Sequence, residues 1–496
     1  MTAYRDLERL FERRALLSEA RGMLHWDRAT MMPAGAAEGR AEQIAALAVL
    51  GHDMLTEPGV ADLLDAAEAA VGDLDDWQAA NLREMRRAWR YATAVPSSLV
   101  AEIERAGGAS EMVWREARPR NDFARQRPYL EEVLRLTREI AGCRARAFGC
   151  APYDALLDEY EAGLTSATID RVFDDLAEFL PDFLDNVLVR QGAAEPPLPP
   201  EGPFEIEAQQ RLATGFMTAL GFDFAHGRLD VSAHPFTGGV PDDVRITTRY
   251  TTDDFTSALM GVLHETGHAL YERGLPTAWR RQPVGGSGGM LLHESQSLLI
   301  EMQVCRGAHF LGYALPRMVE ALGGDGPAWE RDNILRLYQR VERGLIRVDA
   351  DEVTYPLHVI LRYRLERALL SGDLPVADLP AAWNDGMAKL VGVRPPDDRD
   401  GCLQDIHWMD GAIGYFPTYT LGAMAAAQFY AAAVAQSPDI LTGIEVGDFT
   451  PLLTWLRYNV HGQGRRHDAD GLLRQATGRA LDAAPFKAHL QARYLG

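Results

Sequence analysis

Cysteine is scarce in this sequence, and its scarcity limits the class of protein. The 496 residues contain four cysteines, and no two of them have the CxxC spacing. So few cysteines in so long a chain do not make the disulfide framework of a small secreted protein. We therefore expect a cytoplasmic protein with reduced thiols, at Cys143, Cys150, Cys305 and Cys402.

Basic residues are also in deficit. Lysine and arginine together number 50 against 71 aspartates and glutamates, which gives a formal net charge of −21. Nucleic acids and anionic membranes are bound through a basic surface, which this balance does not favour. We expect neither of them as a partner.

The sequence also lacks a hydrophobic leader and an uninterrupted membrane span. Its first 20 residues are charged and amphipathic, without the apolar centre of a signal peptide. Residues 411–438 carry no charge, but Gly414, Pro417 and Gly422 interrupt them and no basic cluster flanks them. This stretch predicts a loop followed by a buried core helix.

Amphipathic helical patterning is what the sequence has in abundance. Apolar residues recur at a spacing near 3.6, with charges on the opposite face, over 4–21, 36–50, 76–92, 128–147 and 168–190. Strand signals are confined to Arg228–Ala233 and Val244–Tyr250, with Gly238, Gly239, Pro241 and Asp242 between them. The pattern predicts a mainly α fold, a large multi-helix body with one small antiparallel β-ribbon.

A proline-rich stretch divides the predicted chain. Residues 192–202 read GAAEPPLPPEG and have no periodicity, which is typical of a surface connector. We predict a single unit over 1–496, made of an N-terminal helical region over 1–191, the connector over 192–202, and a metal-binding catalytic region over 203–496.

The strongest chemical signal is an HExxH sequence directly after the ribbon. It consists of His264, Glu265, Thr266, Gly267 and His268, within a predicted helix over 253–273. A spacing of four places both imidazoles on one helical face, where they can share a metal ion. The flanking residues are apolar, so the helix is expected to be buried. Burying two histidines and a glutamate without compensation would cost several kcal/mol, which favours a bound cation such as zinc.

The third ligand is expected from a later helix. A metzincin would carry glycine where Tyr271 stands, so a glutamate is the better candidate. Glu294 follows a glycine-rich turn, and its polar neighbours favour it over the competing Glu301. Leu298 stands one turn after Glu294, so hydrogen-bond support for the histidines must come from elsewhere.

These residues predict hydrolysis by activated water. Three protein ligands leave a fourth metal position for water, whose pKa zinc can lower to about 7. Glu265 is the candidate general base, and the oxyanion needs at least one protein donor. An aminopeptidase would need an acidic residue for the substrate amine, and no GxMEN-like strand precedes the motif. A zinc oligopeptidase, a dipeptidyl carboxypeptidase and a helical scaffold with a structural metal remain as alternatives.

An ordered series of motifs accompanies the HExxH sequence. They are His25-Trp26-Asp27, Met32-Pro33, His234-Pro235-Phe236, DVRIT at 243–247, His293-Glu294-Ser295, IRVDAD at 346–351 and GCLQDIHW at 401–408. In these motifs the sequence resembles the thermostable carboxypeptidase Taq family over nearly its whole length.

The resemblance implies a cytosolic homodimer with a nearly all-helical fold and a deep groove. It implies removal of single C-terminal residues from peptides with broad preference. It assigns His264, His268 and Glu294 to Zn²⁺, with Co²⁺ as a possible substitute, and Glu265 to catalysis.

Further residues of these motifs are candidates for substrate contact. The resemblance assigns Arg347 to the substrate's terminal carboxylate, which guanidinium matches in a bidentate manner. Structural pairing of Arg347 with Asp349 or Asp351 is the alternative. His407 is a candidate donor to the oxyanion, as are Tyr415 and Tyr419. Arg245 and Thr247 are as compatible with a role in the ribbon as with substrate contact. His234 is expected to shape the groove wall.

Overall fold

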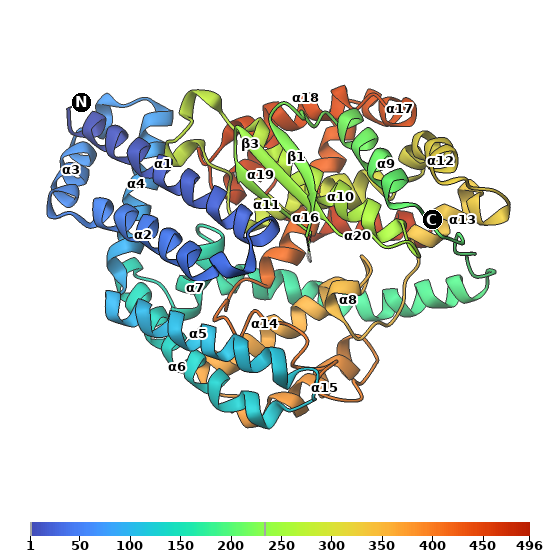
Figure 1. Ribbon diagram of the computed structural model, residues 1–496, viewed down its shortest axis with the longest axis horizontal. Helices are drawn as coiled ribbons and strands as arrows, with labels where there is room; N and C mark the ends of the chain where they lie inside the picture. The colour runs from blue at the N-terminus through green and yellow to red at the C-terminus, as the bar shows by residue number, and fades with distance from the viewer. Residues whose placement is uncertain (1, 233–234) are drawn as a thin grey trace.

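The computed structural model describes residues 2–232 and 235–496, and nearly all their regular structure is helical (Figure 1). The mainly α class is therefore confirmed, and each of the five predicted amphipathic segments lies in a helix. The helices are α1 (Thr2–Thr30), α2 (Ala37–Thr56), α3 (Pro58–Ala69), α4 (Asp76–Ala94), α5 (Ser97–Ala117), α6 (Phe123–Phe148), α7 (Pro152–Tyr160), α8 (Ser166–Gly192), α9 (Ile206–Ala219), α10 (Thr256–Gly274), α11 (Met290–Leu298), α12 (Ala308–Leu322), α13 (Arg331–Tyr338), α14 (Tyr355–Ser371), α15 (Leu379–Leu390), α16 (Pro417–Gln436), α17 (Asp439–Val446), α18 (Thr450–Asn459), α19 (Ala469–Thr477) and α20 (Ala483–Tyr494).

The β-structure differs from the predicted antiparallel ribbon. It is a mixed three-stranded sheet of β1 (Gly227–Val231), β2 (Phe236–Val240) and β3 (Asp243–Thr248), in the order β1-β3-β2. The two segments that were expected to pair antiparallel, β1 and β3, instead pair in parallel. The glycine-containing stretch between them is β2 rather than a turn, and it pairs antiparallel with β3. Parallel pairing needs a crossover connection, and β2 lies within that connection.

One apolar core joins most of the molecule. It takes residues from α6–α8 and from α9 onward, on both sides of the proline-rich stretch. That stretch has no helix or strand between the end of α8 and the start of α9. Two smaller clusters lie outside this core, one beneath α1, α3 and α4 and the other between α5 and α6. The division into an N-terminal region, a connector and a catalytic region stays a prediction.

The charge-free stretch forms a buried helix, as predicted. In α16, Leu421, Met424, Ala425 and Phe429 are all inaccessible to solvent. None of the described helices combines the length and the apolar character that crossing a membrane requires. Helix α16 instead packs against α11, the helix that carries Glu294.

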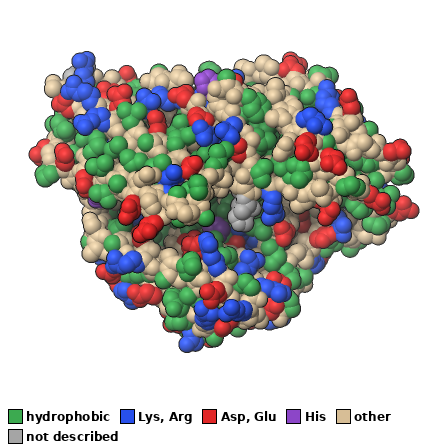
Figure 2. Space-filling view, in the orientation of Figure 1, with side chains coloured by type: hydrophobic (Ala, Val, Ile, Leu, Met, Phe, Trp, Pro, Cys, Tyr) green, Lys and Arg blue, Asp and Glu red, His purple; other side chains and the backbone are tan. Residues whose placement is uncertain are grey.

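A hollow crosses the face shown in Figure 2. In Figure 1 the sheet, α10, α11 and α16 lie above this level, and α5, α6, α14 and α15 lie below it. Figure 2 shows the surface depressed between the two parts, with histidine side chains visible at the bottom. The site described below is built from elements of both parts.

Two glycines allow close packing on both sides of α11. A Cβ at Gly267 of α10 would lie 2.5 Å from the carbonyl oxygen of Gln296. A Cβ at Gly422 of α16 would lie 2.9 Å from the Cβ of Glu294. Because neither distance leaves room for a methyl group, these glycines set the separation of α11 from its two neighbours.

Substitution of Gly267 tests this packing. Gly267→Ala should lower the free energy of unfolding by about 1 to 3 kcal/mol through overpacking, although alanine in a helix interior is otherwise about 1 kcal/mol more favourable than glycine. Gly261→Ala on the same helix is the matched control, because a Cβ there meets nothing within 4 Å. Denaturant unfolding of both variants gives the comparison, and equal stability of the two would contradict the proposed contact.

Candidate metal centre

The structure brings the three predicted metal ligands together. His264 and His268 lie one turn apart on α10, and Glu294 faces them from α11. The Oε2 atom of Glu294 lies 3.9 Å from Nε2 of His264 and 3.6 Å from Nε2 of His268. Candidate ligand atoms of all three residues lie within 4.8 Å of one another. Two imidazoles and one carboxylate are the ligand set of a catalytic His₂Glu zinc site.

The electrostatics of this cluster suit a cation. Burial alone would lower the pKa of His264, but Glu301 and Glu294 raise it to about 10. Burial and the neighbouring histidines His293 and His264 hold the pKa of His268 well below its ordinary value. A buried site where one imidazole is driven to carry a positive charge has a strongly negative potential. A divalent metal ion would supply that positive charge, so the residues present fit a metal.

Glu301 supports one of the histidines instead of joining the cluster. Its Oε2 lies 2.9 Å from Nδ1 of His264, and its Oε1 accepts a hydrogen bond from Nη2 of Arg306 at 2.7 Å. Burial raises the pKa of Glu301, but Arg306 and His264 outweigh it and hold the value at about 2. A carboxylate on the far nitrogen of a metal-binding histidine fixes its orientation. Glu301 thus gives His264 the hydrogen-bond support that Leu298, one turn after Glu294, cannot give.

A change in helix geometry separates Glu294 from Glu301. Residues Leu299–Cys305 continue α11 as a π-helix, so Glu301 lies in wider turns than Glu294. Such π-turns recur at functional sites because they re-aim side chains without ending the helix. The two glutamates are seven residues apart, and both lie beside His264. Glu294 lies on the Nε2 side of the ring and Glu301 on the Nδ1 side.

Glu265 is held beside the cluster by the sheet. The hydroxyl of Thr237 on β2 donates a hydrogen bond to Oε2 of Glu265 at 2.7 Å, and it lies 3.0 Å from the carbonyl oxygen of the same residue. Glu265 is 8% exposed. The edge strand thus fixes the carboxylate and the helix that carries it. Thr237 was not singled out in the sequence, because nothing local links it to a residue 28 positions away.

Arg347 does not pair with the aspartates of its own motif. Its Nε and Nη2 donate to Oδ1 of Asp405 at 3.1 and 2.9 Å, and its Nη1 donates to the hydroxyl of Tyr355 at 2.8 Å. Asp351 instead accepts from the backbone N–H groups of Val353 and Thr354. The alternative of structural pairing with Asp349 or Asp351 is therefore wrong, and the acidic partner is Asp405.

The charges of both Arg347 and Glu294 act on three tyrosine hydroxyls, those of Tyr355, Tyr415 and Tyr419. Burial raises the pKa of Tyr355. The charge of Arg347 opposes this rise, and the charge of Glu294 adds to it. The same two charges act on Tyr419, whose pKa is also raised, and on Tyr415, whose pKa rises to about 12. All three phenols are therefore neutral donors at neutral pH.

His407 is the partner of Tyr419. Its Nε2 lies 3.3 Å from the Tyr419 hydroxyl, and its Nδ1 lies 4.0 Å from Oδ1 of Asp405. Burial lowers the pKa of His407 to about 4; the charge of Asp405 opposes this, and those of Arg347 and Arg362 act in the same direction as burial. His407 is therefore neutral at neutral pH.

Two candidate residues take part in the sheet instead of the cluster. Arg245 donates to Asp243 at 2.9 Å and lies over the ring of Trp26. Thr247 accepts hydrogen bonds from the Ser232 hydroxyl and from the backbone N–H of Phe236. These contacts support the sheet, and whether either residue contacts substrate stays untested. His234, which was expected to shape the groove wall, lies outside the described residues.

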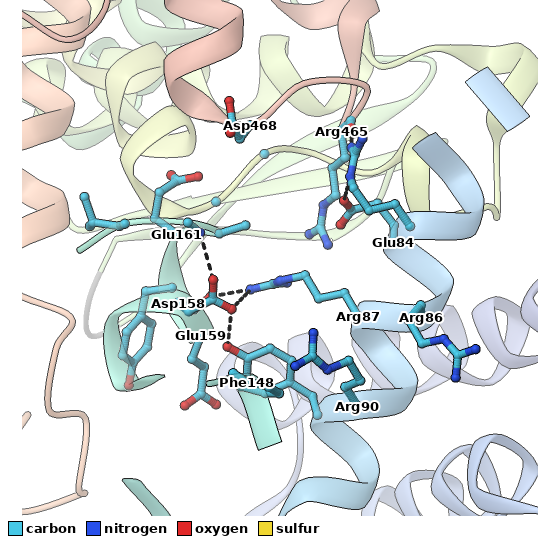
Figure 3. A pocket seen from close by; sticks show the side chains of 18 of the residues that line it. Glu84, Arg86, Arg87, Arg90, Phe148, Asp158, Glu159, Glu161, Arg465 and Asp468 are labelled. Carbon is cyan, nitrogen blue, oxygen red and sulfur yellow. Dashed lines mark hydrogen bonds and ion pairs between the residues drawn. The ribbon is translucent and has the colours of Figure 1, made fainter. Parts of the chain in front are cut away.

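A cavity of about 1110 Å³ adjoins the site but contains none of the three clustered ligands. Its walls include residues of α4 and α7, Gly288 and Gly289 just before α11, and Tyr415. Figure 3 shows Arg87 reaching across it to Asp158, with Glu161 above them. Glu161 accepts hydrogen bonds from the N–H groups of Leu291 and Leu292, so it caps the helix of Glu294. The metal cluster, not this cavity, is therefore the candidate site.

Comparison with known proteins identifies the family. A family model described as Carboxypeptidase Taq (M32) metallopeptidase matches residues 6–494. The chain belongs to the Taq carboxypeptidase family.

Similar proteins match the chain along its whole length. Thermostable carboxypeptidase 1 of Thermus thermophilus is 40% identical over 99% of this chain and 98% of its own. The structure of Trypanosoma cruzi metallocarboxypeptidase 1 matches with a TM-score of 0.98 and 42% identity, over 100% of both chains. An M32 carboxypeptidase from Deinococcus radiodurans R1 matches with a TM-score of 0.94 and 39% identity, over 100% of this chain and 99% of the other. Membership of this metallocarboxypeptidase family makes the protein a peptide hydrolase and implies a divalent metal.

The orientation of His264 by Glu301 can be tested through metal affinity. Glu301→Gln should weaken Zn²⁺ binding about 10- to 100-fold, because the imidazole loses the carboxylate that fixes it. Competition with a chelating dye measures the affinity. Glu272→Gln is the matched control, since Glu272 bonds to Nε2 of His293, outside the cluster, at 3.0 Å. Unchanged affinity in the Glu301 variant would remove Glu301 from this role.

Proposed function

We propose that the protein is a zinc-dependent carboxypeptidase that removes single C-terminal residues from peptides with broad preference. The observation that carries the proposal is the cluster of His264, His268 and Glu294 beside a buried Glu265. A cationic group, Arg347, donates a hydrogen bond to the hydroxyl of Tyr355, whose pKa the charge of Glu294 also shifts. The cytoplasm as location and a homodimer as assembly belong to the same proposal. The four free cysteines support the former, and the family resemblance supports the latter.

His264, His268 and Glu294 would hold the zinc. When bound, it would supply Lewis acidity, which makes water a better nucleophile at neutral pH and polarises the scissile carbonyl. Glu301 keeps Nδ1 of His264 occupied, so that its Nε2 stays directed toward Glu294 and His268. Glu294 would thus bind the metal, and Glu301 would orient His264.

Glu265 would move the proton. As general base it accepts a proton from the attacking water and later gives it to the leaving amine. The hydrogen bond from Thr237 occupies Oε2 and leaves Oε1 for the proton. Since Tyr419 and His407 share a hydrogen bond and are both neutral, we assign stabilisation of the oxyanion to this pair.

Arg347 would bind the terminal carboxylate of the peptide. An enzyme that acts only at a C-terminus needs a cation beyond the scissile bond. Arg347 makes cation–π contacts with Phe416 and Tyr419, 5.4 and 5.2 Å from the ring centroids. Aromatic walls of this kind hold the guanidinium in one plane and suit a bidentate carboxylate.

A pair of blocked peptides tests the function. The Zn²⁺-loaded protein should trim an N-acetylated peptide one residue at a time from its C-terminus, and it should leave the C-terminal amide of the same peptide nearly intact. Mass spectrometry of the products gives the answer. Release of dipeptides, or cleavage of the amide at the same rate, would replace the proposal with a dipeptidyl carboxypeptidase or an oligopeptidase.

Substitution of the general base separates binding from catalysis. Glu265→Gln should keep one Zn²⁺ per chain and lose turnover by about 10²- to 10⁴-fold or more, because general base catalysis contributes that factor. Metal content and kcat are measured on the same preparation. Turnover close to that of the unmodified enzyme would exclude Glu265 as the base.

A further inference from the structure

A fully buried arginine, Arg362, shares the carboxylate of Asp405 with Arg347. Arg362 on α14 is 0% exposed, and its Nε donates to Oδ2 of Asp405 at 2.6 Å. Its Nη1 donates to the carbonyl oxygen of His358, and its Nη2 donates to Oε1 of Gln404 at 2.8 Å. The same Gln404 oxygen accepts the backbone N–H of Arg347 at 2.8 Å. Two arginines from different segments are therefore fixed on one Asp-Gln pair.

The charge count of this cluster matters for the proposed carboxylate subsite. If Arg347 paired with Asp405 alone, the pair would have no net charge. A substrate carboxylate would then be attracted by the arginine and repelled by the aspartate. Burial lowers the pKa of Arg362 to about 10, so it remains charged at neutral pH. Two arginines and one aspartate give a net charge of +1, with Oδ1 of Asp405 on Arg347 and Oδ2 on Arg362.

The two neighbouring histidines leave this count unchanged. Burial holds the pKa of His358 at about 3 and that of His407 at about 4, so both are neutral at neutral pH. Glu366 lies one turn beyond Arg362; burial raises the pKa of its carboxyl group to about 7, which keeps part of it protonated at neutral pH. Its oxygens accept from Tyr153, Trp408 and the N–H of Gly414 and not from either arginine. In the described part of the chain, Asp405 alone among carboxylates forms an ion pair with either arginine.

Arg347 also keeps donors for a ligand. A guanidinium has five N–H groups, and three of those of Arg347 donate to Asp405 and Tyr355. Two remain. We infer that Arg362 is a positioning residue for C-terminal specificity, which offsets the charge of Asp405 so that Asp405 can orient Arg347 without cancelling it. The inference rests on the proposed function, and it assigns Arg362 no contact with substrate.

The experiment compares three variants on the N-acetylated peptide with a free carboxylate and on its C-terminal amide. Arg362→Met should raise KM for the free peptide at least about tenfold, since Asp405 then neutralises Arg347. Its kcat, its Zn²⁺ content and its slow cleavage of the amide should stay close to those of the unmodified enzyme. Arg362→Lys keeps the charge and should keep most of the preference. Arg347→Ala marks complete loss of the preference.

The double variant Arg362→Met with Asp405→Asn decides between charge and packing. It restores a net charge of +1 on Arg347 and should bring KM for the free peptide back toward the original value. A merely structural role predicts the opposite, with the double variant at least as impaired as the single one and with both peptides affected alike. That result would overturn the inference.

Two further outcomes are also decisive. If Arg362→Met does not fold, judged by thermal unfolding, the double variant decides, because Asp405→Asn removes the buried charge that has lost its second arginine. Loss of preference in it as complete as in Arg347→Ala would overturn the inference, and retained preference would support it. If the unmodified enzyme itself does not prefer the free peptide, the proposed function fails, whatever the Arg362 variants do.

Discussion

The contact between α10 and α11 at Gly267 is the constraint on which the site depends. The two histidines come from one helix and the carboxylate from the next, so the distance between the helices sets the distance between ligands. Gly267 lies in the HExxH sequence itself, and it allows the backbone at Gln296 to approach where any side chain would block it. Gly422 provides the same closeness on the other side, against the Cβ of Glu294. The side chains of His264, His268 and Glu294 have limited reach, so a metal site made of them needs backbones this near to one another.

Buried charge is the second constraint, and it is met by pairing. Burying an ionised group without a partner costs several kcal/mol. Glu301 therefore lies between His264 and Arg306, and Asp405 lies between Arg347 and Arg362. Each chain of contacts ends in an arginine that is itself fully or largely buried. The arrangement keeps the functional groups charged inside the protein, where their interactions are stronger than in water.

Local sequence predicted the parts of the site that depend on helix periodicity. The spacing of His264 and His268 determines their common face, and the glycine-rich turn before Glu294 indicates a new helix. The structure brings these residues together as expected. Five of the long helices followed from the same periodicity, and the buried helix at 417–436 followed from the absence of charge.

Contacts between distant segments could not be predicted in this way. The parallel pairing of β1 with β3 depends on where β2 is placed, which no local pattern states. Asp349 and Asp351 were the obvious partners of Arg347 by proximity, but Asp405 lies 58 positions away. Arg362 and Glu366, four residues apart, have the spacing of an exposed helical ion pair, yet both are 0% exposed and each binds the loop that carries His407. Their apolar neighbours on α14 were the available signal of burial.

The placement of these groups explains why such a site would release one residue at a time. In the proposed function, Arg347 binds the peptide carboxylate, and zinc held by His264, His268 and Glu294 would polarise the scissile carbonyl. Arg347 is backed by Asp405, whose side chain is 11% exposed, and by the buried Arg362 and Gln404, and these groups are hydrogen-bonded to one another. A chain that continued past the terminal residue would have to displace this cluster and leave its charges unpaired. The cost of that displacement, several kcal/mol for each buried ion, is far larger than the gain from a few added contacts. In the proposed function, selection for chain ends thus follows from the charged cluster behind Arg347.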